Sequence, residues 1–111
     1  MRRRALMATP PDQWPAAIEL LKRARELVAR PGGWCGPHGR DEKGAVSATF
    51  ALMDSDPENW LWHAVSVEMG HALPDDWHYL DRFEAAPGRT QADVVEAFDR
   101  EIARREARAA A

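Results

Sequence analysis

The segment Ala86–Ile102 constrains the fold most, because it specifies a turn, a helix start and a buried helix face in succession. Pro87-Gly88 is typical of a tight turn, since Pro fixes φ and Gly tolerates positive φ. Thr90 is a good N-cap, and Asp93 stands three residues later, where its carboxylate reaches the cap N–H. One arc then carries Val94, Val95, Phe98 and Ile102. The pattern predicts an amphipathic helix packed on a core.

The apolar pattern ends at Ile102, although Ala and Arg continue to favour helix to the C-terminus. Without an apolar stripe, residues 106–111 are expected to form a frayed tail. The Glu101–Arg105 spacing predicts a surface ion pair. A solvated helix end is the preferred interpretation of Arg104, Arg105 and Arg108, because Glu101 and Glu106 dilute their charge.

The same segment resembles a family of small bacterial and phage proteins known only as a domain of unknown function. The matching residues are Ala86-Pro87-Gly88-Arg89-Thr90 and Phe98-Asp99-Arg100-Glu101-Ile102. Phe83 takes the family's aromatic position, but Glu84-Ala85 replace a common Asn-Asp pair. A second partial match is Leu27-Val28-Ala29-Arg30 followed by Trp34-Cys35. The resemblance spans residues 14–105 and implies a compact helical domain, with no known activity to transfer.

Length and composition predict one domain over residues 12–105, after a flexible arm over residues 1–11 that ends in Thr9-Pro10-Pro11. Met7 is a second candidate start. The net charge of −3, with both signs mixed, argues against nucleic-acid and anionic-membrane partners. Cys35 is the only cysteine, which fits a reducing cytoplasm. No apolar run has the length of a membrane span or a secretory signal.

Three more helices are expected. Asp12 is a candidate cap for the first, which buries one face and ends at Pro31-Gly32-Gly33. That apolar face consists of Ala17, Leu20, Leu21, Ala24, Leu27 and Val28. Residues 31–44 read as a loop, and residues 45–53 fit both a strand and a helix. Their β-branched residues and the preceding turn favour an extended segment, such as one arm of a small hairpin.

The remaining two helices follow Asp54. Asp56 as N-cap and Pro57 at the first position predict a helix that runs to His71. It is apolar over most of its circumference, which indicates a central, mostly buried helix. Gly70 allows close packing there or frays the helix end. Asp75 or Asp76 is expected to cap a short fourth helix that turns Trp77, Leu80 and Phe83 inward. The predicted fold is mainly α: a compact bundle of about four helices, with a loop or small β-hairpin between the first two.

Glu68 is the most unusual candidate for a functional role, because it falls inside the apolar arc of the central helix. With His71 it forms Glu-x-x-His, a spacing that helix-bundle metal sites use. A buried carboxyl group also tends to have a raised pKa, which suits a general base. The preferred alternative is that Glu68 pairs with an arginine or lies at the rim of the core, since a second Glu-x-x-His is missing.

Cys35 and His38 form a Cys-x-x-His unit that offers two metal ligands, with His63, His71 or His78 to complete a site. Structural zinc sites present two close ligand pairs, and this chain has one. A Cys–His catalytic dyad is a further alternative, and a buried, unreactive Cys35 is the default. The chain has no phosphate loop, nucleotide fingerprint or His-Glu-x-x-His motif, so no cofactor or metal is expected.

Trp60 and Trp62 point about 200° apart on a helix, so both cannot face one core layer. They are candidate interface residues, because aromatic anchors dominate protein interfaces. The preferred function is therefore a small, non-catalytic binding or regulatory protein with a protein partner or a second copy of itself. The alternative is a metal-binding protein or hydrolase-type enzyme centred on Glu68, His71, Cys35 and His38. Arg89 is also a candidate, since it has no required role in its own turn.

Overall fold

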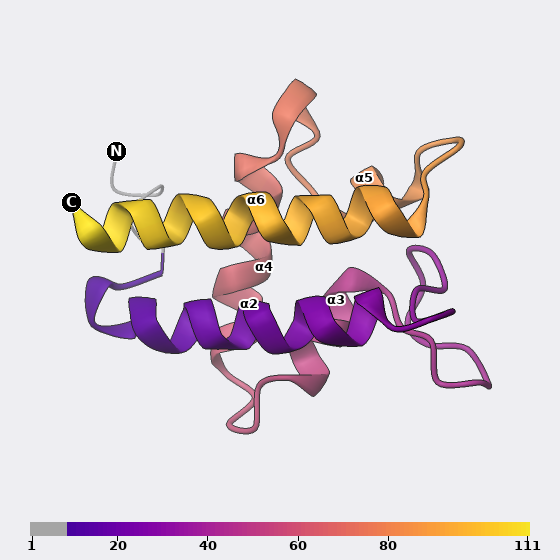
Figure 1. Cartoon of the computed structure of the whole chain (residues 1–111), viewed down its shortest axis with the longest axis horizontal. Helices are drawn as coiled ribbons and strands as arrows, with labels where there is room; N and C mark the ends of the chain where they lie inside the picture. Colours follow the sequence, from indigo (N-terminus) through magenta and orange to yellow (C-terminus); the bar gives the residue numbers. More distant parts are fainter. Residues whose placement is uncertain (1–8) are drawn as a thin grey trace.

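Two long antiparallel helices, α2 (Trp14–Ala29) and α6 (Gln91–Ala110), form one side of the molecule (Figure 1). Helix α4 (Leu61–Ala72) crosses behind both of them. The computed structural model describes residues 9–111. The remaining elements are short, in chain order η1 (Pro11–Gln13), α3 (Ala48–Asp54), η2 (Pro74–Asp76) and α5 (Leu80–Ala85). The mainly helical bundle is confirmed.

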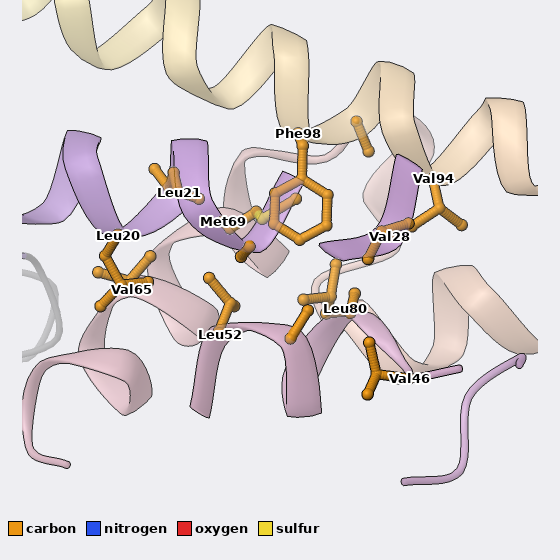
Figure 2. Packing of buried hydrophobic residues seen from close by; sticks show 14 of the residues in the cluster. Leu20, Leu21, Val28, Val46, Leu52, Val65, Met69, Leu80, Val94 and Phe98 are labelled. Atoms are coloured by element: carbon orange, nitrogen blue, oxygen red, sulfur yellow. The ribbon is translucent and has the colours of Figure 1, made fainter. Parts of the chain in front are cut away.

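A single apolar core lies between the α2–α6 pair and the shorter helices, with Phe98 near its centre (Figure 2). Every helix from α2 to α6 contributes to it. Its fully buried members include Leu20, Leu21, Val28, Leu52, Val65, Met69, Val94 and Phe98. The predicted apolar face of α2 is buried as expected, apart from the partly exposed Leu27. Within residues 9–111, no helix is both long enough and apolar enough to cross a membrane.

Helix α6 begins as the sequence predicts. The Thr90 hydroxyl accepts a hydrogen bond from the Asp93 N–H (3.1 Å), and the Asp93 carboxylate accepts one from the Thr90 N–H (3.0 Å). This reciprocal pair satisfies two of the N–H groups that a helix start leaves free. The helix continues to Ala110, past the end of the apolar stripe. Residues 106–110 are thus helical, and the expectation that residues 106–111 fray stays a prediction.

The segment 45–53 is the main correction to the predicted secondary structure. Ala45 and Val46 lie in the loop, where Val46 forms isolated bridges with Trp34 and Arg40, but α3 starts at Ala48. The extended interpretation of 48–53 is therefore wrong. Ser47 is the missed signal: its hydroxyl accepts from the Phe50 N–H (3.2 Å) and caps the helix.

The predicted aspartate caps are also corrected. Asp12 lies in η1, which leads directly into α2 without a side-chain cap. Asp56 is not the N-cap of α4, which begins five residues later, yet its Oδ2 accepts from the N–H groups of Leu61 (2.7 Å) and Trp62 (2.9 Å). Asp56 therefore bonds two N–H groups at the start of α4, although a turn separates it from the helix. Neither Asp75 nor Asp76 caps α5, since η2 and an extended Tyr79 precede that helix.

The expected N-terminal arm is described only in part, because residues 1–8 lie outside the described residues. Thr9 is buried and its hydroxyl accepts a hydrogen bond from Arg105 on α6 (3.0 Å). Pro11 already belongs to η1. Residues 9–13 therefore contact the helical body through Thr9 and η1.

Candidate functional site

Glu68 on α4 is held by three arginines of α6. Its Oε2 accepts hydrogen bonds from Arg104 (2.6 Å) and Arg108 (2.9 Å) and lies 3.5 Å from Arg105 Nη2. Its Oε1 accepts from the backbone N–H of Thr9 (2.8 Å). The ion pair that the sequence favoured is therefore confirmed, with three partners instead of one.

Arg105 is the buried centre of this cluster, with a side chain that is 0% exposed. Its Nε donates to Glu101 Oε2 (2.7 Å), which is also buried. The expected solvated helix end is thus wrong for Arg105 and for its partner Glu101. Arg108 lies over the Trp14 ring (4.2 Å), and Trp14 Nε1 donates to the carbonyl of Thr9 (3.0 Å). The cluster ties the Thr9 segment, α4 and α6 together.

These contacts determine the charge of Glu68. Burial raises the pKa of the Glu68 carboxyl, but the Thr9 and Arg104 hydrogen bonds and the charges of Arg105 and Arg108 oppose this, and the pKa falls to about 2. A carboxylate so stabilised is a weak proton acceptor at neutral pH. The raised pKa expected for a general base is therefore wrong. His71 is exposed, and its ring faces His78 at 5.7 Å between ring centres.

The Cys35–His38 unit lies in the loop between α2 and α3. The Cys35 N–H donates to the carbonyl of Val46 (3.2 Å), and its Sγ lies 3.6 Å from the carbonyl oxygen of Gly39. Burial, followed by the charges of Asp41 and Glu84, raises the pKa of the Cys35 thiol. A raised thiol pKa disfavours the nucleophilic thiolate. His38 is exposed, and its carbonyl, not its ring, is what approaches Cys35 Sγ (3.9 Å).

The candidate residues do not converge on one site. The loop that carries Cys35 and His38 lies at one end of the α2–α6 pair, and the Arg104–Arg108 end of α6 lies at the other (Figure 1). Among residues 9–111, no group of three or more His, Cys, Asp or Glu side chains is placed to hold a metal ion. The structure thus separates the Glu68–His71 pair from the Cys35–His38 pair.

Glu84 on α5 is a buried carboxyl group that sequence reasoning did not select. Its Oε2 accepts from Trp34 Nε1 (2.6 Å) and from the N–H of Ala48 at the start of α3 (2.8 Å). Its Oε1 is buried without a hydrogen-bond partner in the described part of the chain. Burial, with a smaller contribution from the charge of Asp81, raises the pKa of Glu84 to about 7. The one sequence signal was its position, where relatives were expected to carry Asn.

Arg89 has a structural role in the turn before α6. Its Nε donates to the carbonyl of Phe83 (2.7 Å), and its guanidinium lies 3.8 Å above the centre of the Phe83 ring. The same guanidinium lies 5.4 Å from the centre of the Trp77 ring, and its Nη1 is 3.9 Å from Asp93 Oδ2. Arg89 also borders a small hollow of about 150 Å³ with Met69 and several α6 side chains. The side chain that seemed free of a local role instead joins α5 to α6.

Comparison with known families shows which family this chain belongs to. A family described as a family of unknown function (DUF6197) matches residues 13–104. The chain belongs to this family. No curated protein and no solved structure matches it.

The family match covers α2 to α5 and most of α6. In this DUF6197 member, Glu68, Glu101 and Arg104 lie inside the matched range. Thr9, Arg105 and Arg108, which complete the ion cluster, lie outside it. The Ala86–Thr90 turn and Glu84 lie within the matched range.

Trp60 and Trp62 face different surroundings, as their spacing predicts. Trp62 packs against the core, whereas the side chain of Trp60 is 50% exposed. Each indole N–H is satisfied within the turn: Trp60 donates to Glu58 Oε2 (2.7 Å) and Trp62 to Asn59 Oδ1 (2.9 Å). The turn therefore presents one large aromatic ring to solvent in a defined orientation.

Proposed function

We propose that this DUF6197 member is a small, non-catalytic binding protein that contacts another protein through Trp60. The observation that carries the proposal is the half-exposed indole of Trp60 on the turn before α4. Tryptophan is the residue most enriched among interface side chains that dominate binding energy. Trp60 and Tyr79 are the large apolar side chains that the described residues expose most, and a partner that covered the Trp60 ring would gain the free energy of burying it.

The turn around Trp60 is already organised for binding. The buried carboxylate of Asp56 accepts from two N–H groups at the start of α4, and Asn59 adopts a left-handed backbone (φ 56°). The Glu58 carboxylate orients the Trp60 indole. A side chain held in this way loses little conformational entropy when a partner binds, which favours affinity.

The alternative, a metal protein or hydrolase-type enzyme centred on the candidate pairs, has less support. Glu68 is a stabilised carboxylate with a low pKa, and Cys35 is a thiol with a raised pKa. The low pKa makes Glu68 a weak general base, and its two oxygens are already bonded to arginines and to the Thr9 N–H, which leaves them poorly placed to bind a metal ion. The raised pKa of Cys35 disfavours the thiolate that a nucleophile or a metal ligand needs. We further infer a cytoplasmic protein, because the single Cys35 suits a reducing compartment, and a bacterial one from the family resemblance of the Ala86–Ile102 segment.

The first partner to test is a second copy of the chain. Sedimentation of the full chain over a wide concentration range should show self-association that Trp60→Ser weakens at least tenfold. Tyr79→Ser is the matched control, because Tyr79 is a 57% exposed aromatic residue in the link before α5. If the wild type is a strict monomer, a photoreactive amino acid at position 60 should crosslink one protein in the producing bacterium. That protein should then bind the purified wild type more tightly than Trp60→Ser. A monomer that gives no crosslink at position 60 refutes the proposal.

A further inference from the structure

The imidazoles of His71 and His78 lie close together, although no hydrogen bond between them or to them is present within residues 9–111. Their ring centres are 5.7 Å apart and their planes are inclined by 56°. His71 is in the last turn of α4, and His78 is in the extended link that follows η2. Both rings are exposed and border one hollow of about 260 Å³.

Two features of the backbone create this approach. Gly70 is buried against the link, and a Cβ atom there would lie 2.5 Å from the carbonyl oxygen of His78. Only glycine lets the link lie this close to α4. His78 itself has a left-handed backbone (φ 63°), and so do Asp75 and Asp76. Such conformations carry a free-energy cost of about 1–3 kcal/mol in non-glycine residues and concentrate at functional sites.

The separation of the rings matches that of two imidazoles bound to one metal ion. A zinc–nitrogen bond measures about 2.1 Å, and the centre of an imidazole lies roughly 1.1 Å beyond its nitrogen. In tetrahedral geometry, two ring centres then lie roughly 5.3 Å apart. The observed 5.7 Å differs from this by a few tenths of an ångström, which small rotations of two exposed side chains supply.

We propose that His71 and His78 form a two-histidine site for a divalent transition metal ion such as Zn²⁺. Imidazole nitrogen is a preferred ligand of Zn²⁺, Ni²⁺ and Cu²⁺. No third His, Cys, Asp or Glu joins the pair within residues 9–111, so water completes the coordination in the isolated protein. The hollow has room for these waters, and Ser66, Tyr79 and Asp81 give it a polar lining. The site is independent of the Trp60 surface and of the Cys35–His38 loop.

Titration of the full chain with Zn²⁺, followed by calorimetry and by NMR of the imidazole resonances, tests the proposal. One equivalent of Zn²⁺ should shift the His71 and His78 ring signals and leave those of His38 and His63 in place. His71→Gln and His78→Asn should each lower the affinity at least tenfold. Asn suits position 78 because it tolerates a left-handed backbone.

His63→Gln is the matched control, since His63 is also an exposed histidine of α4 and should leave the affinity unchanged. Circular dichroism verifies that each variant keeps its helix content. The proposal is overturned if the wild type binds no Zn²⁺ at millimolar ion concentration. It is equally overturned if His71→Gln and His78→Asn bind as the wild type does, or if Zn²⁺ shifts only His38.

Discussion

Replacement of Glu84 by Gln should remove a specific pH dependence of the free energy of unfolding. Glu84 is 2% exposed, and burial raises its pKa from 4.5 to about 7 in the folded chain. Gln keeps the shape of the side chain, and its carbonyl oxygen still accepts from Trp34 and Ala48. The substitution therefore removes the titration and preserves the two hydrogen bonds that join α5 to the loop and to α3.

The sign and size of the effect follow from linkage. Between pH 4.5 and pH 7 the folded state holds the Glu84 proton and the unfolded state does not, so stability falls as pH rises. A pKa that is raised from 4.5 to about 7 corresponds to a loss of about 3 kcal/mol across the transition. From pH 5 to pH 8 the wild type should lose about 2 to 3 kcal/mol more than Glu84→Gln does.

Urea unfolding at several pH values between 5 and 8, followed by tryptophan fluorescence, measures this difference. Only the difference between the two proteins is interpreted, because all other titrating groups are common to both. Glu96→Gln is the control, since it makes the same change of residue type at an exposed carboxylate, which is paired with Arg100. A difference between wild type and Glu84→Gln that does not change from pH 5 to pH 8 would refute the reasoning.

Two further substitutions test the packing that positions the sites. Gly70→Ala should destabilise the fold by about 1–3 kcal/mol, because the added Cβ meets the His78 carbonyl oxygen. This clash should outweigh the higher helix propensity of Ala, so a variant that is neutral or stabilised in thermal unfolding would contradict the prediction. Arg105→Ala should destabilise by about 2–4 kcal/mol, since it empties a fully buried site and removes the bonds to Glu101 and Thr9, although Arg104 still pairs with Glu101. Exposed Arg100→Ala, the control on the same helix, should change stability by less than about 1 kcal/mol, and equal losses in the two variants would contradict the role of the buried cluster.

The parts of the fold that the sequence predicted are those determined by neighbouring residues. The start of α6 depends on Thr90 and Asp93, which are three residues apart, and both bonds of the predicted pair are present. Helix α3 has only seven residues, and its pattern fits a strand equally well. Its first N–H is bonded by Glu84, which is 36 residues away along the chain. No local pattern contains that contact, and the one local signal for the helix is the N-cap Ser47.

In the candidate site, too, only the features determined by neighbouring residues were predictable. The pairing of Glu68 with arginine was predictable from its place in an apolar arc. Which arginines it meets depends on how α4 crosses α6. The burial of Arg105 depends on Thr9, which is 96 residues away. The Glu101–Arg105 spacing was read correctly as an ion pair, but a helical wheel does not show whether another segment covers the pair.

Glu68 and Glu84 show why residue type and burial do not by themselves determine acid–base behaviour. Glu68 meets three arginines and its pKa falls to about 2, whereas Glu84 meets two uncharged N–H donors and its pKa rises to about 7. The stability that Glu68 contributes is present above pH 4.5 and is lost as pH falls through 2. The stability that protonated Glu84 contributes is present below pH 4.5 and is lost as pH rises through 7. The two contributions therefore overlap most near pH 4.5, and as pH rises through 7 the fold keeps the arginine cluster while the tie between α5 and α3 acquires a buried charge.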